Sequence, residues 1–293
     1  MQLLTTSEAA KYLRLKERKL YELVAENAIP CTKITGRWLF PKAELDHWLS
    51  SSLNRPGGLS RPAPMPIVGG SHDPLLEWAL RESQSGLATL PEGSEAGFDR
   101  FIQGELAAAA IHLHALGVDV DANVEAMRSR ANLYDAVLIG FLRREQGFLV
   151  APGNPLGLQS IGDIAARRAR IALRPKGAGA QLLLLALIEQ AGVKLEQFAT
   201  VEPPCPTGND VAQAIRARRA DCGVAPRAVA NAVGLDFVPL VWERFDIVMR
   251  QHDFFRAPLQ AFVGFLRSPA LAARARELGG YDIADAGRVR YAP

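Results

Sequence analysis

Apolar positions recur with a helical period in three places within the first fifty residues. The first predicted helix begins at Thr6, whose hydroxyl is suited to cap it, and Glu8 suits the positive end of its dipole. A second helix is predicted from about Lys16 to Asn27, and a third from Pro41 to Leu53. The period predicts a small helical unit with one shared apolar core.

Between the second and third helices, two short β-prone runs flank Thr35-Gly36 and predict a hairpin. Basic side chains stand on the first turn of the second helix and on this hairpin. A basic helix N-terminus is what a recognition helix presents to the major groove of DNA, and a basic hairpin behind it is a wing that reaches phosphate. An ordinary solvated helix face is the alternative explanation.

A proline- and glycine-rich stretch separates this block from the rest. Residues 54–66 contain four prolines and two glycines, so neither a helix nor a central strand is expected to cross them. We therefore predict a DNA-binding domain over 1–53, a linker over 54–66 and a second domain over 67–293.

From residue 67 onward, short apolar runs alternate with helical patterns. Strands are predicted at 66–71, 86–90, 107–113, 136–141, 147–151, 170–174, 221–225, 237–242 and 245–250. Helices are predicted at 73–82, 93–103, 179–192, 210–219, 258–266 and 269–278. This alternation predicts an α/β domain with a mainly parallel sheet and helices on both faces.

Three glycine-containing turns precede predicted helices of this domain, at 69–73, 92–95 and 175–180. Glycine lets the backbone approach a ligand closely, and free N–H groups at a helix start favour an anion. Ser71 and Ser94 add hydroxyl groups. A Gly-Ser pair before a helix is also an ordinary N-cap, so a shared pocket rests on the three turns together.

Composition excludes several classes of protein. Of the 293 residues, 48% are hydrophobic and 22% charged, and the formal charge is +3, as in a globular protein of two domains. The first residues lack the features of a signal peptide and no run is apolar enough for a membrane span, so a cytoplasmic location is expected. Cys31, Cys205 and Cys222 lack the spacing of a disulfide framework or a zinc site and are expected to be free thiols.

The first block resembles the excisionase/MerR-type winged helix-turn-helix family. The matching residues are Leu4-Thr5-Thr6-Ser7-Glu8-Ala9-Ala10-Lys11-Tyr12-Leu13, Leu20-Tyr21-Glu22-Leu23, Ile29-Pro30, Gly36-Arg37-Trp38, Pro41 and Leu45-Asp46-His47-Trp48-Leu49. The resemblance implies binding of double-stranded DNA through the second helix and the wing. It carries that role onto Lys16, Arg18, Lys19 and Tyr21 in the helix and onto Lys33, Arg37 and Trp38 in the wing. Tyr21 and Trp38 are equally well explained as packing residues. A DNA-binding domain of this size makes few base contacts, so a homodimer or higher homo-oligomer is expected.

The second block resembles a type II periplasmic-binding-protein-like domain, of the molybdate-binding-protein-like kind found fused to helix-turn-helix domains in bacterial one-component regulators. The residues that carry this are Gly70-Ser71-His72-Asp73-Pro74-Leu75-Leu76, Gly93-Ser94, His112-Leu113, Arg144 to Pro155, Arg219-Ala220-Asp221-Cys222-Gly223, Leu235 to Leu240, Trp242-Glu243-Arg244 and Leu278-Gly279-Gly280-Tyr281. It implies two lobes, of about 67–145 plus 244–293 and of 146–243, closing on a small molecule or an oxyanion such as molybdate or tungstate.

The resemblance and the three turns together predict the ligand-binding residues. These are Ser71, His72, Gly93, Ser94, His112, Lys176, Gly177, Ala178, Gly179 and Ala180. This loop departs from the family, whose phosphate-like loop commonly reads Gly-Ser-Gly-Thr-Arg, because here it reads Gly177-Ala178-Gly179-Ala180-Gln181. Any anion would then depend on backbone N–H groups, the two serines and Lys176, which leaves a small organic ligand open.

Three histidines raise the alternative of a metal site. These are His72, His112 and His114, of which His112 and His114 would share one face of a strand. The spacing of a zinc site is absent, so pocket-lining or buried polar histidines are the better explanation. Neither a metal nor a cofactor is therefore predicted. The common catalytic motifs are also absent, so an enzyme is not predicted.

The sequence is compatible with three functions. The first is a ligand-responsive transcription regulator. The second is an enzyme or accessory protein of molybdenum cofactor handling. The third is an excisionase-like architectural DNA-binding protein without a ligand.

Overall fold

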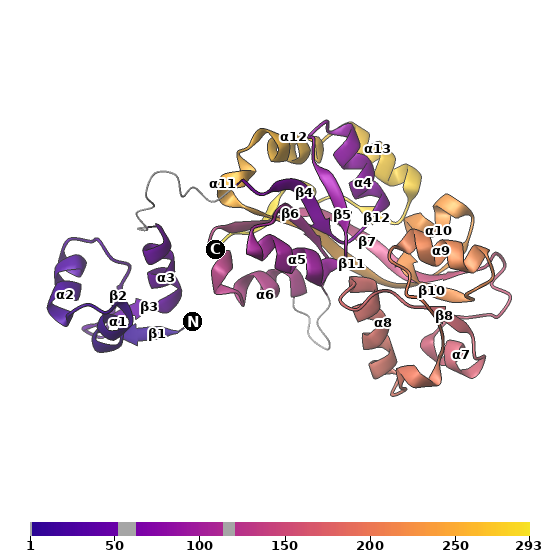
Figure 1. The fold of residues 1–293 in the computed structure, drawn as a ribbon, viewed down its shortest axis with the longest axis horizontal. Helices are drawn as coiled ribbons and strands as arrows, with labels where there is room; N and C mark the ends of the chain where they lie inside the picture. Colours follow the sequence, from indigo (N-terminus) through magenta and orange to yellow (C-terminus); the bar gives the residue numbers. More distant parts are fainter. Residues whose placement is uncertain (1, 52–62, 114–120) are drawn as a thin grey trace. The chain divides into compact units, whose positions relative to one another are not determined.

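The computed structural model describes residues 2–51, 63–113 and 121–293. Two compact units are present, a smaller one at the N-terminus and a larger one that comprises 63–129 and 135–293 (Figure 1). Most of the predicted linker lies outside the described residues, and its last two residues, Met65 and Pro66, belong to the first strand of the larger unit.

The smaller unit has the order strand, helix, helix, hairpin, helix. Its elements are β1 (Leu3–Thr5), α1 (Thr6–Leu13), α2 (Glu17–Ala25), β2 (Thr32–Ile34), β3 (Arg37–Pro41) and α3 (Lys42–Ser51). The strands form an antiparallel sheet in the order β1-β3-β2. The predicted hairpin is confirmed, because β2 and β3 pair on either side of Thr35-Gly36. Its core is a single cluster that includes Ala9, Leu20, Phe40 and Leu45.

Two details of this unit differ from the sequence prediction. The N-cap of α1 is Thr5, not Thr6: the Glu8 carboxylate accepts from the Thr5 N–H at 2.8 Å, and the Glu8 N–H donates to the Thr5 hydroxyl at 3.4 Å. Residues 3–5 are held extended by pairing with β3, so Thr5 is the last residue before the helix. For the same reason α3 begins at Lys42, because Pro41 is paired in β3; residues 52 and 53 lie outside the described part.

The larger unit is built on one mixed sheet of ten strands. The strands are β4 (Met65–Gly70), β5 (Ala88–Pro91), β6 (Leu106–Ile111), β7 (Ala136–Val150), β8 (Arg170–Ala172), β9 (Ala199–Val201), β10 (Cys222–Pro226), β11 (Asp236–Arg250), β12 (Tyr281–Asp282) and β13 (Val289–Tyr291). Their order is β5-β4-β6-β11-β7-β10-β8-β9, with β12 and β13 paired to β7.

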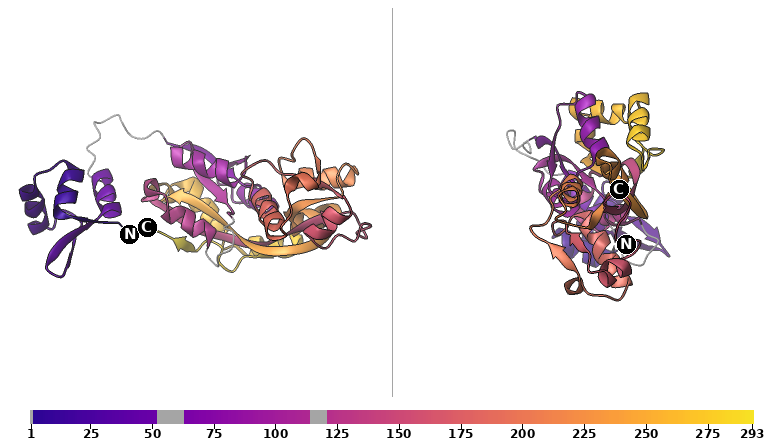
Figure 2. Two further views of the ribbon diagram at one scale, coloured as in Figure 1. Left: turned by 90° about the horizontal axis from the view of Figure 1, so that it is seen from below. Right: turned by 90° about the vertical axis from the view of Figure 1, so that its right-hand side faces the viewer.

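The prediction of a mainly parallel sheet is wrong at its centre. Two parallel groups, β5-β4-β6 and β10-β8-β9, flank the antiparallel pair of β7 and β11. Each of these long strands was predicted as two short ones, because polar residues interrupt both apolar runs. Those residues, among them Arg144 and Glu243, face each other across the pair and satisfy one another. In the left view of Figure 2, β11 runs along the larger unit.

Helices cover the sheet. They are α4 (Pro74–Glu82), α5 (Ser94–Gln103), α6 (Ala122–Arg128), α7 (Ile161–Ala166), α8 (Gly179–Gln190), α9 (Gly208–Arg216), α10 (Arg227–Val233), α11 (Gln251–Phe254), α12 (Ala257–Phe265) and α13 (Pro269–Leu278), with short 3-10 turns at Ala131–Leu133 and Leu195–Gln197. Along β7, Phe148 and Val150 pack with α7 and α8, whereas Leu149 packs with α9 and α10, so helices lie on both faces there. Helices α6, α7, α10 and α11 were not predicted.

The buried apolar side chains form separate clusters at the two ends of the long strands. One cluster draws on segments 68–142 and 245–286. Two others draw only on residues between 148 and 241. We name the end with the first cluster lobe one and the other lobe two, and the domain and lobe limits given above stay predictions.

Candidate functional site

A small cavity lies where lobes one and two meet. Around it stand the end of β4 at Ser71, the end of β6 at His112, and the starts of α8 and α9 at Gly179 and Gly208. Its volume is about 10 Å³, which is room for about one water molecule. The lobes are therefore packed together around a nearly closed cleft.

The structure brings most of the predicted ligand residues to this cleft. Ser71, His72, His112, Ala178, Gly179 and Ala180 line the cavity. Gly93 and Gly177 lie directly behind it, since a Cβ on Gly93 would be 3.4 Å from the Cα of Ala178 and 3.5 Å from the Gly177 carbonyl oxygen. Lys176 is exposed and does not line the cavity. The assignment of these residues to a ligand stays a prediction.

The two serines are joined to each other and to His112. The Oγ atoms of Ser71 and Ser94 are 2.9 Å apart, and both residues are buried. Ser94 Oγ also accepts from the His112 N–H at 3.1 Å. Gly93, at φ 94°, lets the chain turn into α5 so that Ser94 reaches this position. The Ser71 hydroxyl is thus fixed at the wall of the cleft, and Ser94 is buried behind it.

Arg144 is the centre of a buried charge network beside the serines. Its Nε donates to Glu243 Oε1 at 2.6 Å, and its Nη1 donates to Asp73 Oδ2 at 2.8 Å. Its Nη2 donates to His112 Nδ1 at 3.0 Å, and Gln146 Nε2 donates to Glu243 Oε1 at 2.8 Å. The charge of Arg144 is therefore balanced by two carboxylates within the protein. Burial, which acts against the cation, is outweighed by these carboxylates, so the pKa of Arg144 is raised.

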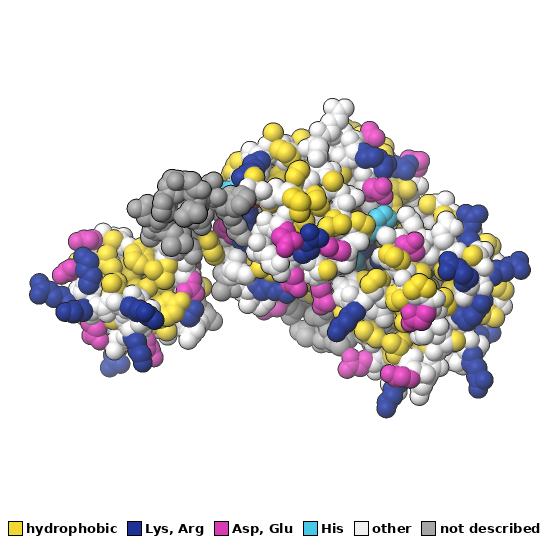
Figure 3. Space-filling view, in the orientation of Figure 1, with side chains coloured by type: hydrophobic (Ala, Val, Ile, Leu, Met, Phe, Trp, Pro, Cys, Tyr) yellow, Lys and Arg dark blue, Asp and Glu magenta, His cyan; other side chains and the backbone are white. Residues whose placement is uncertain are grey.

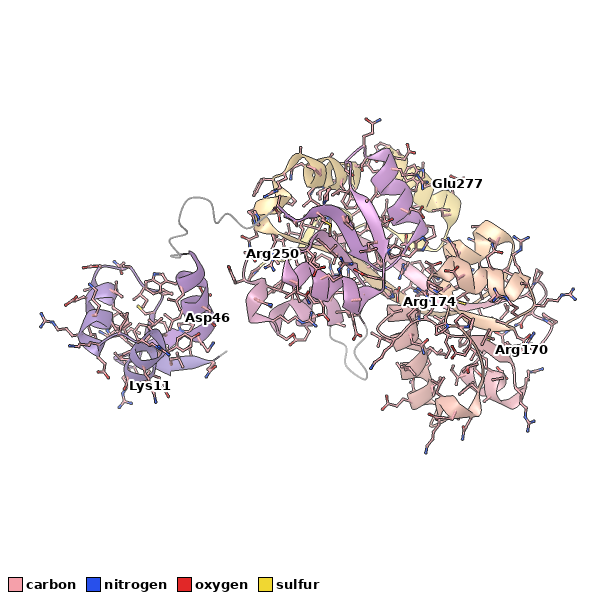
Figure 4. The ribbon with its side chains drawn as sticks, viewed as in Figure 1. Lys11, Asp46, Arg170, Arg174, Arg250 and Glu277 are labelled. Atoms are coloured by element: carbon pink, nitrogen blue, oxygen red, sulfur yellow. The ribbon has the colours of Figure 1, made fainter. Side chains whose placement is uncertain are left out.

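Arg174, which was not predicted from the sequence, also lines the cleft, in an environment different from that of Arg144. Its Nε donates to the Cys205 carbonyl and its Nη2 to the Pro206 carbonyl, both at 2.8 Å. Within the described residues it makes no ion pair. Desolvation, followed by repulsion from Arg144, lowers its pKa to about 10. The group is still charged at neutral pH. Its hydrogen bonds go to carbonyl oxygens and not to a carboxylate, although Asp210 attracts it without forming an ion pair. Figure 4 labels Arg174 in the larger unit.

Arg174 was not predicted as a cleft residue because the end of its strand was placed wrongly. A strand was predicted over 170–174, which placed Arg174 inside the sheet, but β8 ends at Ala172. Arg174 therefore lies in the loop that leads to α8, and its own N–H donates to Gln181 Oε1 at 2.9 Å. An arginine beyond the carboxyl end of a parallel strand is the signal that would have identified it.

Two of the three histidines considered for a metal site, His72 and His112, contact protein side chains instead. His72 Nε2 lies 3.2 Å from Glu77 Oε2, and His112 is held by Arg144 and Ser94. His114 lies outside the described residues. Across the ranges 2–51, 63–113 and 121–293, no group of three His, Cys, Asp or Glu residues is placed to hold a metal ion.

The predicted DNA-binding residues lie on α2, at its start, and on the hairpin of the smaller unit. Lys16 is the N-cap of α2 and is exposed. The Arg18 side chain is 92% exposed and that of Lys19 is 52% exposed, and both reach Glu22, at 3.4 Å and 3.1 Å. Such exposed pairs contribute little to stability, so these cations remain free to exchange Glu22 for a phosphate.

The two aromatic residues of this surface differ. Tyr21 is 50% exposed, on the same helix as the basic residues. Trp38 packs against the core of the unit and lies under the Lys33 ammonium, 5.2 Å from the ring centroid. Lys33 and Arg37 are exposed on the hairpin. Packing therefore explains Trp38, whereas Tyr21 is available for contact.

Comparison with known proteins agrees with this architecture. Residues 3–52 match a helix-turn-helix domain, and residues 77–267 match the PBP superfamily domain, where PBP denotes periplasmic binding protein. A relative from Bacillus subtilis strain 168, the uncharacterized protein YvgK, is 21% identical over 300 residues, covering 97% of this chain and 96% of its own.

Two solved structures share the fold of the larger unit. One is a putative phosphate ABC transporter substrate-binding protein with bound phosphate from Clostridium perfringens, with TM-score 0.52 and 10% identity, covering 72% of this chain and 96% of its own. The other is the tungstate ABC transporter protein from Geobacter sulfurreducens, with TM-score 0.51 and 12% identity, covering 72% of this chain and 97% of its own.

The fold and the two sites define a ligand-binding, DNA-binding regulator: a helix-turn-helix unit joined to a two-lobed binding domain. The chain belongs to the PBP superfamily, and the predicted fold class is confirmed. In the described part of the chain, no helix is both long and apolar enough to cross a membrane.

Proposed function

We propose that this protein is a cytoplasmic transcription regulator whose cleft binds a tetrahedral oxyanion, with molybdate or tungstate as the leading ligands. The observation that carries the proposal is Arg174, a cation at the cleft that is held by carbonyl oxygens and repelled by Arg144. An anion placed beside it would offset this repulsion and accept a charge-assisted hydrogen bond from the Arg174 guanidinium directly.

The surroundings of Arg174 favour an oxyanion over a cation or a neutral molecule. Helices α8 and α9 both begin at the cleft, and the first N–H groups of a helix lack intrahelical partners. Ser71 adds a hydroxyl group on the facing lobe, and Ser94 is hydrogen-bonded to it from behind. Of the two similar structures, one holds bound phosphate and the other is of a tungstate ABC transporter, and both anions are tetrahedral oxyanions.

The nearly closed cleft suggests how the ligand acts. A cavity of about 10 Å³ is too small for a tetrahedral oxyanion, so the lobes must part before it enters. The ligand would then set the balance between lobe arrangements. In a homodimer this balance would change how two N-terminal readers sit on a DNA palindrome.

We infer that the protein is not an enzyme. The cleft holds cations, hydroxyl groups and helix starts, which bind an anion. Arg144 and His112 are committed to fixed partners, and so neither is free to act as a general base or nucleophile.

The ligand is tested on the full chain by thermal unfolding against molybdate, tungstate, sulfate and phosphate. Saturating ligand should stabilise the protein by about 2.7 kcal/mol at 100 times its Kd. Arg174→Met should abolish this stabilisation. Arg276→Met is the matched control, because Arg276 is exposed on α13 and contacts only its own helix among the described residues. If none of the four anions stabilises the wild-type protein, the oxyanion proposal fails.

DNA binding is tested separately. The Arg18→Ala/Lys19→Ala double variant should weaken DNA binding and flatten its dependence on salt, because two phosphate contacts are lost. The control is Arg81→Ala/Arg276→Ala, which removes the same charge from the larger unit. Equal DNA affinity and salt slope in both double variants would overturn the assignment of α2 as the recognition helix.

A further inference from the structure

A second, larger cavity lies in lobe two at the opposite edge of the sheet from the cleft. The cleft is at the carboxyl ends of β8 and β10, whereas this cavity is at their amino ends, beside Arg170 and Asp221. Its volume is about 650 Å³, within the range of sites for small molecules. We call it the distal pocket.

The distal pocket has an apolar floor. Its buried lining includes Leu158, Ile215 and Leu235, and Leu156 and Val233 are partly buried beside them. These side chains come from three segments that meet here: the loop after β7, the end of α9 and the turn before β11. The floor is thus suited to the apolar body of a ligand.

The rim of the same pocket is basic. Arg170 is held by two bonds to Asp221, at 3.0 Å and 2.8 Å. Arg216 and Arg218 are exposed at the rim and make no ion pair in the part of the chain that the structure describes. Figure 3 shows Lys and Arg side chains gathered at this end of the larger unit, and Figure 4 labels Arg170 there.

The backbone of Arg218 has a conformation that favours glycine. It follows α9 in the left-handed conformation, at φ 56°, a position where glycine is favoured. Helices α8 and α10 of the same lobe have glycine there, Gly192 and Gly234, both at φ 68°, whereas α7 is followed by Arg168 at φ 51°. An arginine at this position strains the backbone, and Arg218 shares this strain with Arg168.

We propose that the distal pocket binds an amphipathic organic anion. Its phosphate, sulfonate or carboxylate group would lie against Arg216 and Arg218, and its apolar body against the leucine floor. The concave apolar floor argues against the backbone of DNA as the occupant, because phosphate contacts need only an exposed basic surface. This proposal does not depend on the oxyanion in the cleft.

The probe that tests it is 8-anilinonaphthalene-1-sulfonate, which joins an aromatic body to one sulfonate. Titrated into the full chain, it should show saturable fluorescence enhancement. Arg216→Gln/Arg218→Gly should weaken its binding at least tenfold, because both cationic contacts are lost. The control Arg81→Gln/Arg276→Gln on lobe one, and Arg174→Met in the cleft, should bind the probe as the wild-type protein does.

Three results would overturn the proposal. One is unchanged probe binding in Arg216→Gln/Arg218→Gly, and another is lost binding in Arg174→Met, which would place the probe in the cleft. The third is displacement of the probe by methanesulfonate or by a DNA duplex at concentrations near the probe's own Kd, which would indicate a simple anion or DNA surface. N-phenyl-1-naphthylamine, which lacks the sulfonate, should bind at least tenfold more weakly than the probe.

Discussion

The backbone of Gly179 packs directly on the imidazole ring of His112. A Cβ added to Gly179 would lie 2.0 Å from His112 Nε2 and 2.5 Å from the His112 carbonyl oxygen. Gly179 belongs to lobe two and His112 to lobe one, so this contact holds the cleft closed. The glycine is needed here for its lack of a side chain, because it opens a helix with ordinary backbone angles.

Gly179→Ala should therefore prevent full closure of the lobes. The clash involves backbone as well as the ring, so we expect a loss of about 1–3 kcal/mol in stability and a larger radius of gyration by small-angle scattering. Gly264→Ala is the matched control, because a Cβ on Gly264, in helix α12, meets nothing within 4 Å. That change should be neutral or stabilise by up to about 1 kcal/mol. Identical behaviour of the two variants would mean that this packing does not hold the lobes together.

Arg144→Met should be strongly destabilising. It leaves the carboxylates of Glu243 and Asp73 buried without their cation, and breaking a buried pair costs about 3–5 kcal/mol. Adding Glu243→Gln should restore part of the loss, because one uncompensated charge is removed. Urea unfolding of both variants measures this. A double variant less stable than Arg144→Met would contradict the assignment of Glu243 as the partner of Arg144.

Local signals were sufficient to predict where helices α4 and α5 begin beside the cleft, whereas α10, whose Val229 also lines it, was not predicted. Asp73, Gly93 and Ser94 were recognised as helix starts because their chemistry is local, and the structure places them there. The long strands β7 and β11 were not recognised as continuous. Their polar middle residues are explained only by partners about a hundred positions away, such as Arg144 and Glu243, and one sequence does not reveal such pairs.

The same dependence on distant partners explains which residues of the candidate site were predicted and which were missed. Ser71, Ser94 and Gly179 were predicted because serine and glycine before a helix carry a recognisable anion-binding pattern. Arg174 was missed because its role depends on where β8 ends and on the repulsion from Arg144. The closed cleft could not be predicted either, since it arises from contact between segments of different lobes.

Asp246 should make stability depend on pH. Burial raises its pKa from 3.8 to about 6, although Asn123 and Arg290 bond its carboxylate. Between these values the folded protein binds more protons than the unfolded chain, so stability falls as pH rises from about 4 to 6 and levels off above. Asp246→Asn lacks this titration.

The effect of Asp246 is measured as the difference in stability between the wild-type protein and Asp246→Asn. From pH 4 to pH 7 the stability of the wild-type protein relative to Asp246→Asn should fall by roughly 2–3 kcal/mol, at 1.36 kcal/mol per pKa unit. Urea unfolding at both pH values measures it. Parallel curves for the two proteins across this range would show that Asp246 is not protonated in the folded state at low pH.

Exchanging residues between two helix ends of lobe two tests the strain at Arg218. Arg218→Gly should stabilise the protein by about 1 kcal/mol, because glycine adopts the left-handed conformation without a Cβ clash. Gly192→Arg should destabilise it by a similar amount, since it introduces the same strain at the end of α8, where a Cβ meets nothing within 4 Å. Thermal unfolding of the two single variants gives both values. If Arg218→Gly instead lowers stability, the Arg218 side chain contributes to the fold itself, and its retention needs no ligand.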